Sequence, residues 1–423
     1  MPARLVSRSI SVAFTKAGGL IFSILFLVVA ARLLDPKFFG EFSFFLALIS
    51  VGSAVVSGGF THYWTRQLVV DASDVTERRV MFAVKGSLIW VFFASSLVCL
   101  LVWAVSPLFA TDLVDPFLLA AALVFSAPMA VVAGVMRARG QPAIGELPGI
   151  CLVPLLSALI LGIALTLDFK ITGYSVSRFY VAVLFIVGAL SLRMIAAPIA
   201  AERKNSADVI FRFSSWCRFF LPFCVLSTAG VLLSQSATLI VGLLEGPEPL
   251  ASYRIADRLA VTVSIPLMVL NIVISGPIAK AIYNKNIGLT KELANRVKLL
   301  SVLAGISIAS ALLLFGDYAI ELFFGSAYSG ATYWPMVILI ASNLINVFFG
   351  SVGLILTMAG KEREVLREQT RSILLLLALL VPLTMAYGLL GAAVSVLMST
   401  AFWNYRLYRR LMAWFDGWDG VSA

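Results

Sequence analysis

The sequence predicts an all-α, polytopic membrane protein in which twelve transmembrane helices form two six-helix bundles related by an internal repeat. Of its 423 residues, 61% are hydrophobic and 13% are charged, which is more apolar surface than a soluble fold of this length can bury. Apolar runs long enough to cross about 30 Å of hydrocarbon follow one another along the whole chain. Similar turn sequences separate these runs at corresponding places in the two halves.

The internal repeat is visible in short segments that lie about half the chain length apart. The paired segments are residues 33–40 and 243–253, residues 136–141 and 357–361, and residues 171–173 and 389–391. Each pair occupies the same place between apolar runs in its own half. We therefore predict an N-terminal six-helix bundle at 1–205 and a C-terminal six-helix bundle at 206–423, an architecture that is typical of transporters.

Six apolar runs fall in the first half. They lie at about 10–33, 39–60, 82–106, 114–136, 148–167 and 175–197. The first run ends at Arg32, and the Asp35-Pro36 turn separates it from the second. It is longer than the apolar region of a cleavable signal and another span follows at once, so we expect it to remain as the first helix. The turn from Arg137 to Gly140 separates the fourth run from the fifth.

Six further apolar runs fall in the second half. They lie at about 217–244, 250–279, 298–323, 332–358, 370–388 and 390–412. The Glu245-Gly246-Pro247 turn separates the first two, and Ala359-Gly360-Lys361 precedes the fifth. The last two runs meet at Leu389-Leu390-Gly391. Each run is long enough for one crossing of the membrane.

Lys and Arg concentrate in the N-terminus and in every second loop, which is the distribution typical of cytoplasmic segments. Examples are Arg4 and Arg8, Arg78 and Arg79, Arg137 and Arg139, Lys285 and Arg296, Lys361 and Arg363, and Arg409 and Arg410. The alternate loops carry Asp and Glu with almost no basic residues. We therefore predict that both termini are cytoplasmic, which requires an even number of spans.

The composition also excludes several classes of function. The net charge of +10 is dispersed between apolar runs and does not form the basic surface that nucleic acid binding requires, so we predict no nucleic acid partner. The four cysteines lie within or beside apolar runs, and the single histidine, His62, has no ligating or catalytic partner nearby. We therefore predict no disulfide framework, no metal, no cofactor and no catalytic residue.

Several polar side chains inside the apolar runs are candidates for lining a cavity. They are the amides Gln235, Asn271, Asn343 and Asn346, and the hydroxyl residues Ser57 and Thr61 at the end of the second run. An amide within a membrane span needs a polar partner, and such residues often mark substrate pathways. Two other interpretations stay open: interhelical hydrogen bonding for the amides, and close helix packing for the small hydroxyl residues.

A group of charged residues, Arg254, Asp257 and Arg258, lies in the early turns of the eighth run. This is the predicted outer side, where few arginines are expected. Arg254 and Arg258 are four residues apart and share a helix face, so they are candidates for a phosphate clamp. Asp257 is a candidate for coupling to protons or sodium, or it neutralises Arg254.

Lys16 and Arg66 are two further candidate phosphate contacts. Lys16 lies about one turn inside the cytoplasmic end of the first run, where its ammonium group could instead snorkel to the interface. Arg66 follows aromatic residues at the cytoplasmic end of the second run. An arginine that only sets the topology would occupy the same place in an aromatic belt.

Five segments follow one another in an informative order. They are Leu34 to Ser43, Arg137 to Gly140, Asn271, Leu322 to Gly325 with Tyr328 to Ala331, and Ala359 to Glu362. Their order and spacing over nearly the whole chain resemble the polysaccharide-biosynthesis flippases of the multidrug/oligosaccharidyl-lipid/polysaccharide exporter superfamily. These proteins often carry an acidic residue near the end of the second span, and this chain has Ser57 to Thr61 there instead.

The resemblance implies a flippase that moves an undecaprenyl-pyrophosphate-linked oligosaccharide from the cytoplasmic to the outer leaflet of a bacterial inner (plasma) membrane. The two bundles would enclose a central cavity with alternating access. The product would serve O-antigen, capsule or exopolysaccharide biosynthesis. The implied partners are the lipid-linked oligosaccharide, membrane lipids and, as is typical of the family, a polysaccharide polymerase or chain-length regulator.

Two alternatives belong to other classes of function. A cation-coupled multidrug exporter of the same superfamily would need acidic residues deep in the first bundle, and only Glu41 and Glu146 lie near span ends there. A membrane polysaccharide polymerase or ligase would need a long outer loop with catalytic residues. The predicted outer loops are short, so we expect a protein that is not an enzyme.

Overall fold

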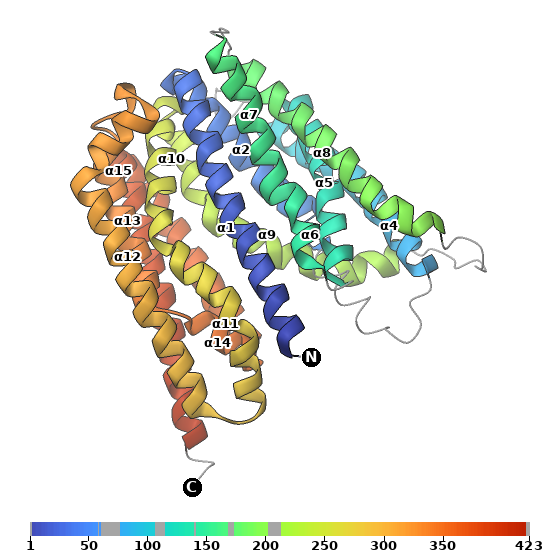
Figure 1. Ribbon diagram of the computed structural model, residues 1–423. Coiled ribbons are helices and arrows are strands. Elements are labelled where there is room, and N and C mark those ends of the chain that lie inside the picture. Colours follow the sequence, from blue (N-terminus) through green and yellow to red (C-terminus); the bar gives the residue numbers. More distant parts are fainter. Residues whose placement is uncertain are drawn as a thin grey trace. The chain divides into compact units, whose positions relative to one another are not determined.

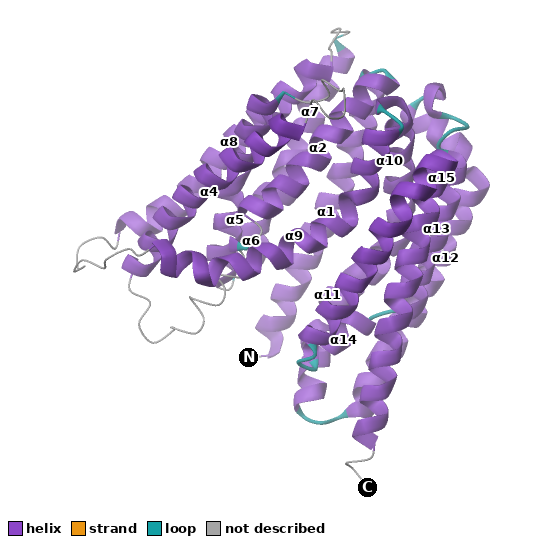
Figure 2. Cartoon of the chain, turned by 180° about the vertical axis from the view of Figure 1, so that it is seen from behind, coloured by secondary structure: helices purple, strands orange, loops and turns teal. Residues whose placement is uncertain are grey.

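The computed structural model describes residues 2–57, 59–60, 77–105, 115–138, 141–167, 173–201 and 213–419. All regular secondary structure within these ranges is helical, and loops join the helices (Figure 1 and Figure 2). The prediction of an all-α protein is therefore confirmed. Two of the predicted site residues, Thr61 and Arg66, lie outside the described residues.

The chain divides into two compact units, each of which is described by itself. The N-terminal unit contains Gly18–Gln235, and the C-terminal unit contains Met1–Ala17 together with Ser236–Ala423. The bundle boundary predicted at residues 205 and 206 falls in a stretch outside the described residues. That boundary therefore stays a prediction.

The N-terminal unit is built around α5 (Pro116–Ala138). This helix packs against α2 (Pro36–Ser57), α4 (Glu77–Val105) and α8 (Gly173–Ala201). The backbones of α5 and α8 approach closely, because a Cβ atom at Gly188 would lie 2.5 Å from the carbonyl oxygen of Phe125. Small residues permit such contacts between membrane helices. The other helical segments of this unit belong to α1 (Pro2–Leu33), α6 (Pro142–Leu147), a π-helical turn (Pro148–Leu152), α7 (Val153–Thr166) and α9 (Phe213–Leu244).

Several helices begin at a proline that the sequence places in a turn. Pro36, Pro116, Pro142 and Pro247 are the first residues of α2, α5, α6 and α10 (Pro247–Val261). Proline suits this position because its fixed φ is already helical and its missing N–H group would have no partner in the first turn. The turns read from the sequence thus determine where these helices start.

The C-terminal unit has α13 (Tyr333–Phe349) at its centre. This helix packs against α10, α12 (Ile287–Phe324) and α15 (Glu362–Asp419), and Figure 1 shows α12, α13 and α15 side by side. The remaining elements are a 3-10 turn (Thr262–Ser264), α11 (Ile265–Tyr283), a second 3-10 turn (Ser326–Tyr328) and α14 (Val352–Met358).

One end of the C-terminal unit is held together by a buried apolar cluster. It joins α11, α12, α14 and the last turns of α15, and it includes Ile278, Val297, Leu356, Leu407 and Phe415. Lipid tails are as apolar as these side chains, so moving the side chains from lipid into the cluster gains no hydrophobic free energy. Close packing stabilises such a cluster in a membrane. The partly buried Trp414 packs against it.

Within the described residues, nine helices are long and apolar enough to cross a membrane, or ten when α13 and α14 count as one bent span. α15 has 58 residues, which is more than two crossings need, and its backbone breaks at Gly388, where φ is 56°. α4 contains a shorter apolar stretch, Ile89–Ala104. The multi-pass membrane architecture is confirmed. The predicted number of twelve spans is approached when α15 counts as two spans and α4 is included.

Candidate functional site

Two neighbouring spans of the C-terminal unit are broken along their length. The 3-10 turn at Thr262–Ser264 interrupts the span formed by α10 and α11, and α13 bends by 44° into α14 at Gly350, where φ is 73°. α10 packs beside α13, and α11 packs beside α14. Transporters bind substrates and ions at broken membrane helices, because the breaks expose backbone groups inside the protein. We therefore treat this pair of broken helices as the candidate site.

The two breaks are connected by a reciprocal pair of hydrogen bonds. Ser264 lies in the first break, and its Oγ donates to Asn343 Oδ1 on α13 at 2.7 Å. Ser351 lies in the second break, and its Oγ donates to Asn271 Oδ1 on α11 at 2.5 Å. Both asparagines were predicted to line a cavity, and the structure shows interhelical hydrogen bonds for both. Their cavity-lining role stays a prediction.

Asn346 lies on α13, one turn after Asn343, and differs from it. Its side chain is half-buried and makes no hydrogen bond within the part of the chain that the structure describes. Its carbonyl oxygen accepts a hydrogen bond from the Gly350 N–H at the α13 break, at 3.2 Å. Of the three asparagines, Asn346 is thus the one whose amide is not engaged between helices. Gln235, in α9, is half-buried.

The charged group predicted from the sequence lies on α10. Arg254 is only 3% exposed, and its Nη1 lies 3.8 Å from Asp257 Oδ2. This distance gives charge attraction without a hydrogen bond. The Asp257 side chain is 29% exposed. Buried arginines in a membrane protein need anionic or polar partners, since an uncompensated charge in hydrocarbon is costly.

Arg258 lies one turn after Arg254 on the same helix. Its Nε atom is buried and has no hydrogen-bond partner among the described residues. Two guanidinium groups and one partly exposed carboxylate therefore lie on consecutive turns of α10. An anionic ligand would supply an acceptor for the buried Arg258 Nε–H group.

The structure thus brings six of the predicted residues into the two broken helices. Arg254, Asp257 and Arg258 lie on α10, Asn271 lies on α11, and Asn343 and Asn346 lie on α13. Three other predicted residues, Gln235 in α9 among them, lie elsewhere. Ser57, at the end of α2, donates its hydroxyl to the Ser53 carbonyl at 2.8 Å, and Lys16 is half-buried in α1.

Sequence reasoning missed a charge cluster around Glu368, near the start of α15. The Glu368 side chain is fully buried, and its carboxylate accepts hydrogen bonds from Arg371 Nη1 at 2.9 Å, Arg406 Nε at 2.9 Å and Arg410 Nη2 at 3.2 Å. Each arginine is between 30% and 44% exposed. Charge-assisted hydrogen bonds of this kind are the strong ones. The cluster ties the two halves of α15 together.

A signal for this cluster exists in the sequence. Glu368 and Arg406 lie at similar distances on either side of Gly388, where α15 reverses. In an antiparallel helix pair, residues equidistant from the turn lie at the same level. The charges were interpreted only as topology signals, so their pairing across the turn was not considered.

In the N-terminal unit, Arg137 forms an ion pair with Glu146, whose side chain is 8% exposed. The pair joins the end of α5 to α6 across the Arg137 to Gly140 turn. Arg137 therefore holds two consecutive helices together as well as contributing to the basic loops.

Solved structures of membrane transporters and of a flippase share this fold. An inward-facing multidrug resistance MATE family transporter of the MOP superfamily matches with a TM-score of 0.75 and 14% identity, covering 97% of this chain and 100% of that chain. The lipid II flippase MurJ, in an inward closed conformation, matches with a TM-score of 0.70 and 12% identity, covering 95% and 86%. A MOP superfamily transporter from Pyrococcus furiosus matches with a TM-score of 0.64 and 12% identity, covering 98% and 97%.

The family follows from the sequence itself. The model of the polysaccharide biosynthesis protein family matches residues 6–283, which is more than half of the chain. The chain belongs to this family, and the resemblance read from its turn motifs is confirmed. No curated protein sequence matches the chain.

Proposed function

We propose that this protein is a flippase that moves an undecaprenyl-pyrophosphate-linked oligosaccharide from the cytoplasmic to the outer leaflet by alternating access. The observation that carries the proposal is membership of the polysaccharide biosynthesis protein family in a chain with a transporter fold. A flippase of lipid II is built on the same fold. The product would enter O-antigen, capsule or exopolysaccharide biosynthesis.

Such a substrate makes three physical demands on the protein. Its pyrophosphate needs fixed cations, because an uncompensated charge within the hydrocarbon layer costs several kcal/mol. Its sugars need hydrogen-bonding groups, because polar groups lose their water on entering the protein. Its lipid tail needs no polar contact and can stay in the bilayer during the crossing.

Arg254 and Arg258 are the proposed phosphate contacts within the span. Arg254 is only 3% exposed, so its guanidinium group does not reach bulk water. The buried Nε of Arg258 has no hydrogen-bond partner among the described residues. Guanidinium groups bind phosphate oxygens through paired N–H donors. Lys16 and Arg66 are proposed to contact the pyrophosphate as it enters from the cytoplasm.

The polar side chains of the spans are the proposed contacts for the sugars. Asn346 is the strongest of these, since its half-buried amide has no hydrogen bond among the described residues. The other proposed cavity residues are Gln235, Asn271, Asn343, Ser57 and Thr61. Asn271 and Asn343 would serve the sugars only after exchanging their serine partners.

Asp257 is the proposed site of coupling to protons or sodium, because its carboxylate is 29% exposed beside the buried Arg254. The proposed location is a bacterial inner membrane, with both termini in the cytoplasm. The proposed partners are a polysaccharide polymerase or chain-length regulator acting on the delivered oligosaccharide. The reaction is a translocation, so we propose that no covalent step takes place on this chain.

The test is flipping of a labelled undecaprenyl-pyrophosphate oligosaccharide in proteoliposomes. We expect activity in the wild type and loss of at least tenfold in the Arg254→Ala/Arg258→Ala double variant. The matched control is Arg363→Ala/Arg367→Ala, which removes two arginines at the same spacing from exposed positions on α15. The control variant is expected to keep wild-type activity.

Each remaining outcome has a definite meaning. If the wild type flips the lipid and the α10 variant does so equally well, the arginines are structural and only the phosphate assignment is overturned. If the wild type flips no lipid-linked oligosaccharide but exports a cationic dye, the flippase proposal is overturned in favour of a multidrug exporter.

A further inference from the structure

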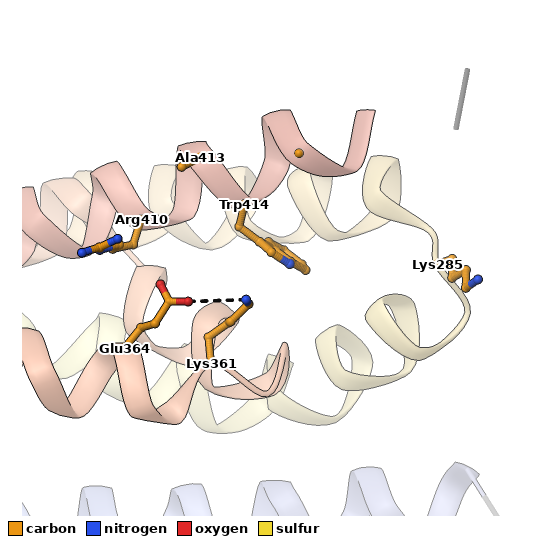
Figure 3. A pocket seen from close by; sticks show the side chains of 7 residues that line it. Lys285, Lys361, Glu364, Arg410, Ala413 and Trp414 are labelled. Carbon is orange, nitrogen blue, oxygen red and sulfur yellow. Dashed lines mark ion pairs between the residues drawn. The ribbon is translucent and has the colours of Figure 1, made fainter. Parts of the chain in front are cut away.

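A basic pocket lies at one end of the C-terminal unit, next to the C-terminal ends of α11 and α14. It has a volume of about 560 Å³ and is lined by Lys285, Lys361, Glu364, Arg410 and Trp414 among others. Figure 3 shows Lys361 and Glu364 on one wall, Arg410 and Trp414 on the facing wall, and Lys285 at one end. The lining comes from the loop between α11 and α12, from the start of α15 and from its last turns.

The charge of the pocket is positive after its internal pairs are counted. The Lys361 Nζ lies 3.4 Å from the Glu364 Oε1, so one lysine is neutralised. Arg410 shares the single carboxylate of Glu368 with Arg371 and Arg406, so that carboxylate cannot compensate all three. Lys285 is exposed. A pocket with this excess of cationic donors fits an anion that has several oxygen acceptors.

The backbone of Lys285 is in a strained conformation. Lys285 has a φ of 55°, and it is the only non-glycine residue with positive φ in the described part of the chain. Hydrogen bonds from the Lys285 N–H to the Ile282 oxygen at 3.0 Å and from the Asn286 N–H to the Ala281 oxygen at 2.9 Å hold this turn. A glycine would adopt the conformation without strain. The presence of lysine at a strained position is a reason to look for a function of its side chain.

The aromatic residues of the pocket indicate its depth in the membrane. Trp414 lines it, and the neighbouring Phe415 lies below the Lys291 ammonium, 5.0 Å from its ring centre. Tryptophan and basic residues gather at the headgroup level of the bilayer. The loops that carry Lys285 and Lys361 are those predicted from their positive charge to be cytoplasmic, where anionic lipids attract basic segments.

We propose that this pocket binds the phosphate-bearing headgroup of an anionic membrane phospholipid, with Lys285, Lys361 and Arg410 as the phosphate contacts. Trp414 forms the apolar wall along which the glycerol and upper acyl carbons lie. The site is separate from the proposed α10 contacts, and it does not depend on which substrate the protein transports.

The experiment is a lipid titration of the full-length protein in detergent, read by native mass spectrometry. The probes are phosphatidylglycerol, zwitterionic phosphatidylcholine, and inorganic phosphate and glycerol phosphate as soluble sources of the same chemistry. We expect phosphatidylglycerol to bind the wild type more tightly than phosphatidylcholine. Removing two cations in Lys285→Gln/Lys361→Gln is expected to weaken its binding by at least about tenfold.

Two further variants make the test specific to the pocket. Glu364→Gln removes the carboxylate that lines the pocket among the residues that the structure describes, so we expect it to tighten phosphatidylglycerol binding severalfold. Lys280→Gln/Arg296→Gln removes two exposed cations, one near the C-terminal end of α11 and one near the N-terminal end of α12. Neither residue lines the pocket. This control is expected to change binding by less than about twofold.

Three results would overturn the proposal. Equal weakening in the control would show that general surface charge, and not the pocket, attracts the lipid. Weaker binding in Glu364→Gln would contradict the assignment of excess positive charge. Displacement of phosphatidylglycerol by millimolar inorganic phosphate or glycerol phosphate would assign the pocket to a soluble anion and not to a lipid.

Discussion

Ser264 Oγ donates a 2.7 Å hydrogen bond to Asn343 Oδ1, so the break in one membrane helix is bonded to the side of its neighbour. The bond from Ser351 to Asn271 does the same in the opposite direction. Each broken helix therefore supplies a serine from its break and an asparagine from its regular part. In the absence of water, these side chains satisfy one another, and the two breaks are held at a fixed register.

The Ser264–Asn343 bond is expected to show measurable coupling. In a double-mutant cycle of Ser264→Ala and Asn343→Leu, the coupling free energy of unfolding should be about 0.6 kcal/mol and no more than about 1.7 kcal/mol, the range for polar contacts within membranes. The measurement is denaturant unfolding in detergent micelles. Ser264→Ala combined with Ser307→Ala is the control, because the Ser307 hydroxyl donates to the Leu303 carbonyl in its own helix. Full additivity in the test pair would contradict the bond.

Glu368 is expected to be essential for the stability of the C-terminal unit. In Glu368→Gln the side chain keeps its shape but leaves three guanidinium groups without their shared charge. Breaking a buried pair costs about 3–5 kcal/mol, and the partial exposure of the arginines reduces this to about 2 kcal/mol. A lowered thermal midpoint in detergent checks the prediction.

The control for Glu368 is Glu292→Gln, which removes a carboxylate that is 51% exposed and paired with Arg296 one turn away. Exposed pairs of this kind contribute at most about 0.5 kcal/mol. If both variants lower the midpoint equally, burial of Glu368 has no special effect and the cluster is not a stabilising element.

Gly388→Ala is expected to destabilise the turn between the halves of α15. At Gly388 the backbone has φ 56° and ψ −133°, a region that residues with a Cβ atom avoid, and strain there costs about 1–3 kcal/mol. Gly276→Ala is the matched control in α11, because a Cβ atom there would meet nothing within 4 Å. The control should be neutral or stabilising by up to about 1 kcal/mol. Equal midpoints for the two variants would contradict the turn.

Most of the fold could be predicted from the sequence, because each membrane helix can be recognised from its own segment of the chain. Each apolar run must satisfy its backbone internally, so length and composition predict a helix, and prolines such as Pro36 and Pro247 indicate where helices begin. The breaks at Thr262–Ser264 and Gly350 were not predicted. The serines in these breaks bond to partners in a neighbouring helix, Asn343 and Asn271, about eighty residues away.

The candidate site was predictable in its residue types but not in its pairings. Charges and amides in an apolar run stand out in any sequence, so Arg254, Asn271 and Asn346 were found. Whether a given amide forms a hydrogen bond to a neighbouring helix depends on how the helices are rotated and packed. A single sequence does not specify that arrangement. Glu368 was missed because two of its three arginines, Arg406 and Arg410, lie beyond the turn at Gly388 and their charges were interpreted only as topology signals.

Replacing Asn343 or Asn346 with leucine is expected to affect the stability of the protein differently, because, of these two residues, Asn343 is the one that bonds to a neighbouring helix. Asn343→Leu should lower the stability of the protein through loss of the Ser264 bond. Asn346→Leu removes an amide without a hydrogen bond among the described residues, so stability should be unchanged within about 0.5 kcal/mol. If the amide binds the transported sugars, flipping in proteoliposomes should fall severalfold in Asn346→Leu at matched protein levels. Unchanged flipping in a stable Asn346→Leu protein would remove this residue from the proposed cavity. A loss of stability in Asn346→Leu would mean that the amide has a structural partner.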